Sequence, residues 1–282
     1  MGAIVDDQLP KSLEYDEVGG WSELKLEILR KYCAAYSPIL TKRKLHHSYI
    51  DGFAGAGHHL SKQTGDLIPG SPINALEIVP PFCEYHFIDL DETRTEELRR
   101  LSQGRANVYV YDGDCNTILL TQVFPNIRYK EYRRALCVLD PYRLQLKWEV
   151  LQAAARERTI EVFLNFPILD MNRNVFHDVA TPEKRRKMTA FWGDESWEKV
   201  AFCTEWNLFG DPEKQPNEAI VEAFRSRLRE VAGFQYVPKP VPMRNSKNSP
   251  VYYLFFAAHQ KTANKIMSDI FDGYRSKGIL HG

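Results

Sequence analysis

Acidic residues follow four short apolar segments of the chain. Asp51, Asp89 and Asp140 each end or directly follow such a segment, and Asp112 and Asp114 follow another. In an open parallel sheet, ligands bind in the crevice beyond the carboxyl ends of the strands. If the segments are strands of one such sheet, the acids gather at one edge, where they can accept hydrogen bonds from a ligand. The sequence therefore predicts one site that several strand ends share.

The first of these acids opens a glycine-rich loop, Asp51-Gly52-Phe53-Ala54-Gly55-Ala56-Gly57. Glycines allow tight turns and a close approach of the backbone to a ligand, and in nucleotide sites such a loop leads into a helix. The spacing differs from the dinucleotide pattern GxGxxG, and the lysine of a P-loop is missing. The loop resembles the first motif of class I methyltransferases, which implies S-adenosylmethionine as cofactor. The alternative is a plain strand-to-helix turn. The expected cofactor-binding residues of the loop are Asp51, Gly52, Phe53, Gly55 and Gly57.

Two further acids complete the expected cofactor site. Asp89 ends the next apolar segment, where an acid can accept hydrogen bonds from ribose hydroxyls, and Asp91 is a second candidate for that role. Asp114 follows the third segment, where a carboxylate can accept a hydrogen bond from the adenine amino group. The alternative for Asp89 and for Asp114 is a helix cap. Because an acid follows each of three successive strands, we favour a shared ligand site over separate helix caps.

The fourth segment ends in Asp140-Pro141-Tyr142. This resembles the Asp-Pro-Pro-Tyr motif of amino-methyltransferases, although one proline stands where the motif has two. The resemblance implies catalytic roles for Asp140, Pro141 and Tyr142: the acid and the adjacent carbonyl would accept hydrogen bonds from the target amine, and the ring would stack on a flipped base. The alternative is a strand-ending turn. Asn165 and Asp170 follow a fifth apolar segment and could reach a substrate there; the alternative is a hydrogen-bonded loop.

Strands and helices that alternate along the chain would position these residues. We expect an α/β, Rossmann-like class I methyltransferase fold: a mostly parallel seven-stranded sheet with helices on both faces, a C-terminal β-hairpin and a helical insertion at 166–212. Residues 1–17 form a flexible lead-in, and 18–282 form the domain. Ser22 is the expected N-cap of the first helix. Strands are expected at 48–50, 85–88, 108–111, 135–139, 160–164, 235–241 and 251–257, and helices at 21–40, 71–78, 92–101, 148–156, 217–231 and 261–271.

The composition excludes several other classes of protein. Lys plus Arg and Asp plus Glu are both 37, so the 282-residue chain has no net charge to mark a dedicated nucleic-acid binder, although a local basic face stays open. Five cysteines, never in CxxC spacing, indicate neither a disulfide framework nor a zinc site. The two histidine pairs, His46/His47 and His58/His59, lack acidic partners at ligand spacing, so no metal site is expected. The polar N-terminus and the absence of a long apolar run predict a cytoplasmic protein without a membrane span.

Several stretches of the chain together carry a more specific resemblance. They are 18–22, 49–57, 70–72, 87–89, 113–116, 139–148 and 164–167, of which 139–148 is the most specific. These stretches resemble the three-Cys-motif partner proteins. The resemblance implies a class I methyltransferase-like fold in a prokaryotic setting and a companion protein that carries three cysteines and is radical-SAM-like.

Two hypotheses on function follow. The first is methyl transfer from S-adenosylmethionine to an amino group on a nucleobase or a similar amine. The second is a non-catalytic, adenosyl-binding partner of the three-cysteine companion. The single proline after Asp140 and the zero net charge favour the second, whereas the glycine-rich loop together with Asp140-Pro141-Tyr142 favours the first.

Overall fold

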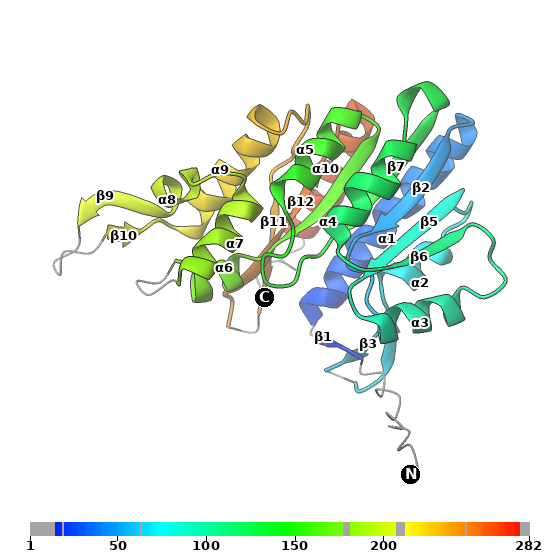
Figure 1. Cartoon of the computed structure of the whole chain (residues 1–282), viewed down its shortest axis with the longest axis horizontal. Helices are drawn as coiled ribbons and strands as arrows, with labels where there is room; N and C mark the ends of the chain where they lie inside the picture. Colours follow the sequence, from blue (N-terminus) through cyan, green and yellow to red (C-terminus); the bar gives the residue numbers. More distant parts are fainter. Residues whose placement is uncertain are drawn as a thin grey trace, which may run out of the picture.

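One seven-stranded sheet forms the centre of the molecule (Figure 1). The computed structural model describes residues 15–18, 20–62, 64–176, 181–206, 212–245 and 247–276. Most of the predicted lead-in, up to residue 14, lies outside these ranges. The strand order is β11-β12-β8-β7-β2-β5-β6. The bounds are β2 His46–Asp51, β5 Glu84–Asp89, β6 Val108–Asp112, β7 Arg133–Leu139, β8 Ile160–Phe166, β11 Val241–Arg244 and β12 Pro250–Ala257.

The sheet is mostly parallel, as the sequence predicts. Strands β6, β5, β2, β7 and β8 run parallel, whereas β12 is antiparallel to β8 and to β11. The chain winds outward from β2 through β5 to β6 and then returns to β7 on the other side of β2. This reversal between β2 and β7 is a topological switch point, the place where open α/β sheets bind their ligands.

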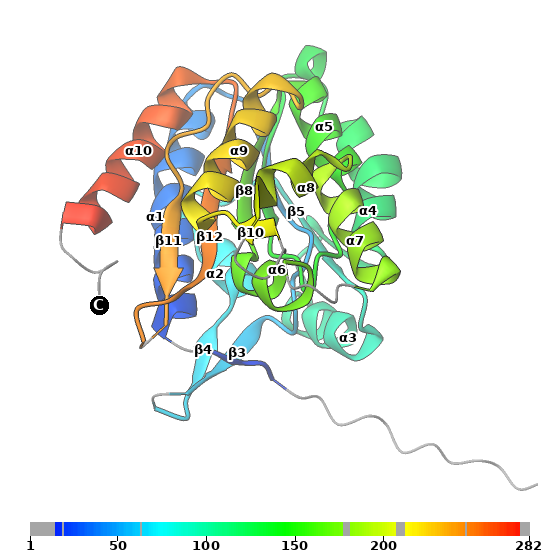
Figure 2. The same cartoon turned by 90° about the vertical axis from the view of Figure 1, so that its left-hand side faces the viewer.

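Helices cover both faces of the sheet, because its strands are apolar on both faces (Figure 2). Tyr49 packs in one buried cluster with side chains of α1, α2, α3 and α10, whereas its neighbour Ile50 packs in a second cluster with side chains of α4, α5 and α9. The bounds are α1 Gly20–Lys42, α2 Ser71–Leu76, α3 Glu92–Leu101, α4 Cys115–Ile118, α5 Trp148–Glu157, α9 Asn217–Glu230 and α10 Lys261–Ser276. None of the helices in the described part of the chain has the length and apolar character that a membrane span requires.

The glycine-rich loop does not lead directly into a helix, so that expectation was wrong. The chain first forms β3 (His58–Ser61) and β4 (Leu67–Pro69), which join β1 (Glu17–Val18) in a small separate sheet. A hydrogen bond of 2.8 Å from the Gly70 N–H to the Gly57 carbonyl joins the two ends of this β3–β4 segment, and α2 begins only at Ser71. The sequence gives little sign of β3 and β4 because both are short and only partly buried.

Two smaller expectations were also wrong. The strand expected at 235–241 begins only at Val241, and before it one isolated bridge joins Tyr236 to Ala258. Pro238 and Pro240 interrupt this segment, and proline cannot donate to a strand ladder. Ser22 is not an N-cap, because α1 already begins at Gly20 and Ser22 is buried inside the helix.

The segment expected as a helical insertion also contains strands. Three helices are followed by an antiparallel pair that projects from the body (Figure 1). The helices belong to the buried cluster on one face of the sheet, since Met188, Phe191 and Trp197 pack in it. The bounds are α6 Ile168–Asn174, α7 Pro182–Trp192, α8 Ser196–Ala201, β9 Phe202–Trp206 and β10 Pro212–Lys214.

Candidate functional site

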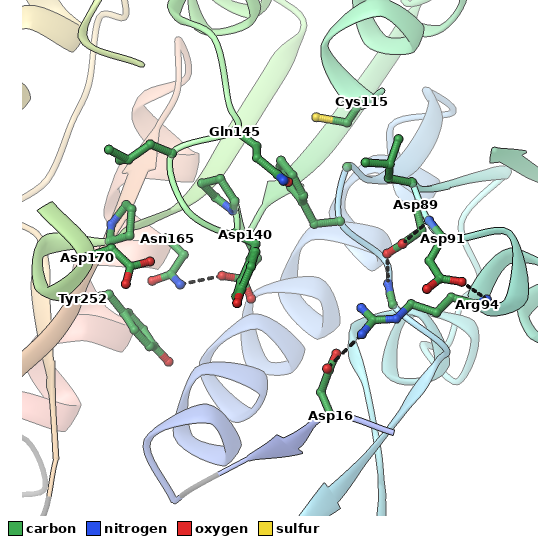
Figure 3. Close-up of a pocket in the computed structure, with 18 of the residues that line it drawn as sticks. Asp16, Asp89, Asp91, Arg94, Cys115, Asp140, Gln145, Asn165, Asp170 and Tyr252 are labelled. Atoms are coloured by element: carbon green, nitrogen blue, oxygen red, sulfur yellow. Dashed lines mark hydrogen bonds and ion pairs between the residues drawn. The ribbon is translucent and has the colours of Figure 1, made fainter. Parts of the chain in front are cut away.

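A cleft of about 1710 Å³ lies at the carboxyl ends of the parallel strands. It extends across the switch point from α3 on one side to α6 and α7 on the other (Figure 3). We call the part formed by the glycine-rich loop, β5 and β6 the cofactor half, and the part formed by β7, β8 and α6 the acceptor half, after the ligands that the sequence predicts there. Eight of the ten predicted site residues line the cleft: Gly52, Phe53, Gly55, Asp89, Asp114, Asp140, Pro141 and Tyr142.

Asp89 holds the glycine-rich loop in the cofactor half. Its Oδ2 accepts a hydrogen bond of 2.8 Å from the Gly55 N–H, and its Oδ1 accepts one of 3.0 Å from the Asp91 N–H. Gly55 has φ +64°, a conformation that favours glycine. The N-cap of α3 is Asp91, whose Oδ1 accepts a hydrogen bond of 2.9 Å from the Thr93 N–H. The cap that was the alternative for Asp89 therefore belongs to Asp91.

Asp51 and Gly57 do not line the cleft. Asp51 is fully buried beneath the loop, where it accepts hydrogen bonds from the Ser71 hydroxyl at 2.6 Å and the Phe53 N–H at 3.3 Å. Burial raises the pKa of Asp51 to about 6, although both hydrogen bonds oppose this shift. Gly57 has φ +83° and lies against Leu101. These two residues shape the loop from behind, and the cofactor contacts that the sequence predicts for them stay a prediction.

Asp114 caps a helix as well as lining the cleft. Its carboxylate accepts hydrogen bonds from the Thr117 N–H at 3.2 Å and the Thr117 hydroxyl at 2.8 Å, at the N-terminus of α4. Its Oδ1 also accepts one of 2.8 Å from the Asn116 amide. The capping alternative is thus confirmed for Asp114, at the wall of the cofactor half.

Asn116 fixes the loop that follows β7. Its amide group donates to the Gln145 carbonyl at 2.9 Å, and its Oδ1 accepts from the Lys147 N–H at 2.7 Å. The loop needs this support, because Arg143 and Leu144 both have positive φ, +51° and +61°. Left-handed backbone at non-glycine residues persists where the surroundings enforce it, and it is concentrated at functional sites.

The same loop presents an aromatic ring at the mouth of the cleft. The side chain of Tyr142 is 61% exposed, and the Arg143 guanidinium lies 4.8 Å from the centre of its ring. Pro141, in contrast, is buried. An exposed ring held on a fixed loop can stack on a flat ligand.

Asp140 is half-buried between two partners. Lys25 of α1 donates to one carboxylate oxygen, and the Asn165 amide donates to the other. The second contact follows from the register, because Leu139 pairs with Leu164 and the next residues are neighbours at the sheet edge. Burial raises the pKa of Asp140, but Lys25 and Asn165 outweigh it and leave the pKa below its ordinary value. Asp140 is therefore an anion that is already paired with a cation.

Polar side chains from β8, α6 and β12 complete the acceptor half. Asn165 is the last residue but one of β8, Asp170 lies in α6, and Tyr252 comes from β12, with the Lys25 ammonium 5.9 Å from the centre of its ring. The sequence marked Asn165 and Asp170 by their position after a strand, but no local pattern marked Lys25, Asn116 or Tyr252 as partners in one site. Within the described ranges, no three His, Cys, Asp or Glu side chains are grouped as ligands for a metal ion.

Comparisons with known proteins show the fold. No family model matches the sequence, and no curated protein matches it. The protein LPL1258 from Legionella pneumophila, of the DUF519 family, superposes with a TM-score of 0.54 at 13% identity, over 89% of this chain and 91% of its own.

Two solved methyltransferases give lower scores. The N-methyltransferase NodS from Bradyrhizobium japonicum, in complex with S-adenosylhomocysteine, has a TM-score of 0.42 at 9% identity, over 85% of this chain and 86% of its own. A SAM-dependent methyltransferase from Leishmania major has a TM-score of 0.37 at 13% identity, over 84% and 82%. The seven-stranded, mostly parallel sheet with helices on both faces is a Rossmann-like α/β fold.

Proposed function

We propose that this protein binds S-adenosylmethionine and transfers its methyl group to an amino group of a nucleobase or a similar amine. The observation that carries the proposal is the position of Asp140-Pro141-Tyr142 beside the loop braced by Asp89, in one cleft at the switch point of the sheet. One half of the cleft suits an adenosyl group, and the other offers polar groups and a ring to an acceptor.

The cofactor half fits an adenosyl group by its chemistry. Gly52 and Gly55 expose backbone to the cleft, and Asp89 has a carboxylate there to accept hydrogen bonds from ribose hydroxyls. Asp114 lines the same half and would accept a hydrogen bond from an adenine amino group while it caps α4. The exposed Leu90 adds an apolar surface beside Asp89 for the base. When bound, S-adenosylmethionine supplies an electrophilic methyl group.

The acceptor half would hold the amine for transfer. Most of the catalytic effect would come from positioning the nitrogen and from keeping water away. Tyr142 would stack on the flat ring that carries the amine, on a loop held by Asn116. Asp140 and its neighbours would supply the hydrogen-bond acceptors.

A thermal-shift titration with S-adenosylmethionine and S-adenosylhomocysteine tests the cofactor site. At 100 times the dissociation constant, a ligand adds about 2.7 kcal/mol to the free energy of unfolding. We expect a higher melting temperature for the wild-type protein and a lost shift in Asp89→Ala. Asp112→Ala is the matched control, because Asp112 ends the adjacent strand but pairs with Arg99 and does not line the cleft. No shift at millimolar ligand would contradict the proposal.

A transfer assay tests the reaction. Labelled S-adenosylmethionine would be incubated with unmodified RNA and DNA oligonucleotides, and the label in the nucleic acid would be counted. We expect transfer by the wild-type protein and its loss in Tyr142→Ala, while S-adenosylhomocysteine binding is retained.

A second function is favoured by one observation, the pairing of Asp140 with Lys25. An acid that is already neutralised by a cation suits a non-catalytic, adenosyl-binding partner of a three-cysteine, radical-SAM-like companion. Binding of S-adenosylhomocysteine without transfer to any oligonucleotide, together with a complex between the two proteins on size exclusion, would favour this function.

A further inference from the structure

Asn165 has a buried amide oxygen without a partner. The residue is only 8% exposed, yet it lines the acceptor half of the cleft. Its Nδ2 donates to Asp140, whereas no hydrogen bond reaches its Oδ1 from the described residues. A buried acceptor that is left unsatisfied destabilises the fold, so such atoms are rare and call for an explanation.

The orientation of this amide is fixed by Asp140. The lowered pKa of Asp140 keeps its carboxylate ionised, and an ionised carboxylate only accepts hydrogen bonds. The NH₂ group of Asn165 must therefore face Asp140, and its oxygen must point the other way. Lys25 holds the second oxygen of Asp140 and so keeps this arrangement in place.

The part of the cleft that Asn165 lines favours hydrogen-bond donors. Figure 3 shows the Asn165 amide nitrogen directed at Asp140. Asp170 also lines the cleft, and its negative charge opposes the entry of phosphate or carboxylate groups there. An amino group, which has two N–H donors and no negative charge, suits both acceptors.

Resting on the proposed function, we infer that Asn165 Oδ1 accepts a hydrogen bond from the exocyclic amino group of the nucleobase that is methylated. Asp140, held by Lys25, is then a positioning residue that orients Asn165. The hydrogen bond directs one N–H toward Oδ1 and leaves the nitrogen lone pair to face the cofactor half. In the transfer this lone pair forms the N–C bond, the C–S bond of the cofactor breaks with its electrons on sulfur, and the released proton goes to water.

Binding of matched nucleosides to the protein saturated with S-adenosylhomocysteine tests the inference. The probes are adenosine and purine riboside, which lacks only the amino group, and cytidine with its 4-deamino analogue. One hydrogen bond contributes about 0.5–1.5 kcal/mol, so we expect wild-type protein to bind one amino-bearing nucleoside up to about tenfold more tightly than its analogue. Asn165→Leu should bind both members of that pair equally.

Asn172→Leu is the matched control. Asn172 also has a buried Oδ1 without a partner among the described residues, and its amide donates to another side chain, Asn217. It does not line the cleft, so this variant should keep the wild-type preference. Asp140→Asn is a second variant that does not depend on the folding of Asn165→Leu. Its neutral amide no longer dictates the orientation of Asn165, so the preference should fall while S-adenosylhomocysteine still binds.

The outcomes separate this inference from the proposed function. A wild-type preference that survives in Asn165→Leu overturns the role of Asn165. Wild-type protein that binds S-adenosylhomocysteine but shows no preference in either pair also overturns that role and leaves the cofactor site standing. Protein that does not bind S-adenosylhomocysteine overturns the proposed function and the inference together.

Discussion

The two halves of the cleft are built in different ways. In the cofactor half, acids hold backbone N–H groups: Asp89 holds Gly55, and Asp51 holds Phe53 from below. In the acceptor half, side chains hold side chains, and the contact between Lys25 and Asp140 joins residues 115 positions apart. The first half is shaped by the course of the backbone, whereas the second depends on side chains that distant elements bring together.

This difference predicts how each half responds to mutation. A change behind the glycine-rich loop should disturb folding and cofactor binding together, because the loop packs on the core. A change in the acceptor half should alter transfer and acceptor binding, while cofactor binding is retained.

Gly57→Ala should have the largest effect on stability. Gly57 has φ +83°, and an added Cβ would lie 2.9 Å from Leu101 Cδ1. Left-handed backbone costs a non-glycine residue about 1–2 kcal/mol, and overpacking costs about 1–3 kcal/mol more. We therefore expect urea denaturation to show a free energy of unfolding lower by roughly 2–5 kcal/mol.

Gly55→Ala is the matched control for that variant. Gly55 has φ +64°, but no atom lies within 4 Å of an added Cβ. Only the backbone cost of about 1–2 kcal/mol should appear, together with weaker S-adenosylhomocysteine binding, because Gly55 lines the cleft. Equal losses of stability in the two variants would show that the packing of Gly57 on α3 does not matter.

Asp51→Asn should change the pH dependence of stability. Burial raises the pKa of Asp51 in the folded protein to about 6, from an ordinary value of 3.8. The folded state therefore binds more protons than the unfolded state between these values, and the free energy of unfolding falls as the pH rises from about 4 to 6. At 1.36 kcal/mol per pKa unit, the contribution is at most about 3 kcal/mol.

Urea denaturation of the wild-type protein and of Asp51→Asn at several pH values checks this prediction, because their free energies of unfolding can be subtracted. Other groups titrate in the same way in both proteins, so the wild-type value minus the Asp51→Asn value isolates the contribution of Asp51. We expect this difference to decrease between pH 4 and 6 and then to stay constant. A difference that is independent of pH would mean that Asp51 has an ordinary pKa beneath the loop.

Asp140→Ala should show directly whether the two halves of the cleft respond independently to mutation. It leaves the Lys25 ammonium, which is 15% exposed, without its carboxylate partner. Loss of one partner from a fully buried pair costs about 3–5 kcal/mol, but the Asp140 side chain is 34% exposed, so we expect about 2 kcal/mol after solvent screening. S-adenosylhomocysteine should still raise the melting temperature.

The double variant Lys25→Met with Asp140→Ala provides the control. It removes the unpaired charge, so the free energy of unfolding should return toward the wild-type value. If Asp140→Ala abolished S-adenosylhomocysteine binding, the division of the cleft into two independent halves would be wrong.

The same comparison explains what could be predicted from the sequence. Most strands were predicted because each is a short apolar segment that ends in an acid or a turn, and the loop acids were found because backbone geometry places them at the strand ends. Strand alternation places the Asp51 side chain beneath the loop, facing Tyr49 and Ser71, and its contact with the cofactor stays a prediction.

The acceptor half could be predicted only in part. Asp140 and Tyr142 stood out by their motif, but the partner of Asp140 lies on a helix near the start of the chain, and only the packing of α1 on the sheet brings the two together. In the sequence, only its position two residues after Asp114 marked Asn116. Its contacts with the loop after β7 depend on where β6 and β7 lie in the sheet, which local patterns do not specify.

Asn116→Ala should destabilise the protein less than Gly57→Ala and Asp140→Ala, and its main effect should be on the loop that follows β7. The variant loses the bonds to the Gln145 carbonyl and the Lys147 N–H, which together contribute about 1–2 kcal/mol. The strained residues Arg143 and Leu144 then lose their support and can relax toward ordinary backbone angles. Limited trypsin digestion with mass spectrometry measures this, because trypsin cleaves after the exposed Arg143.

We expect cleavage after Arg143 to be several-fold faster in Asn116→Ala than in wild-type protein, while cleavage elsewhere is unchanged. Asn74→Ala is the matched control, because the Asn74 amide also donates to two backbone carbonyls, of Pro69 and Gly70, at 2.9 Å each, but far from this loop in the chain. Transfer should fall with the loss of a fixed position for Tyr142, and S-adenosylhomocysteine binding should change less. Unchanged cleavage after Arg143 would show that Leu144 and the buried Pro141 hold the loop without Asn116, and that the acceptor half is as much a product of the backbone as the cofactor half.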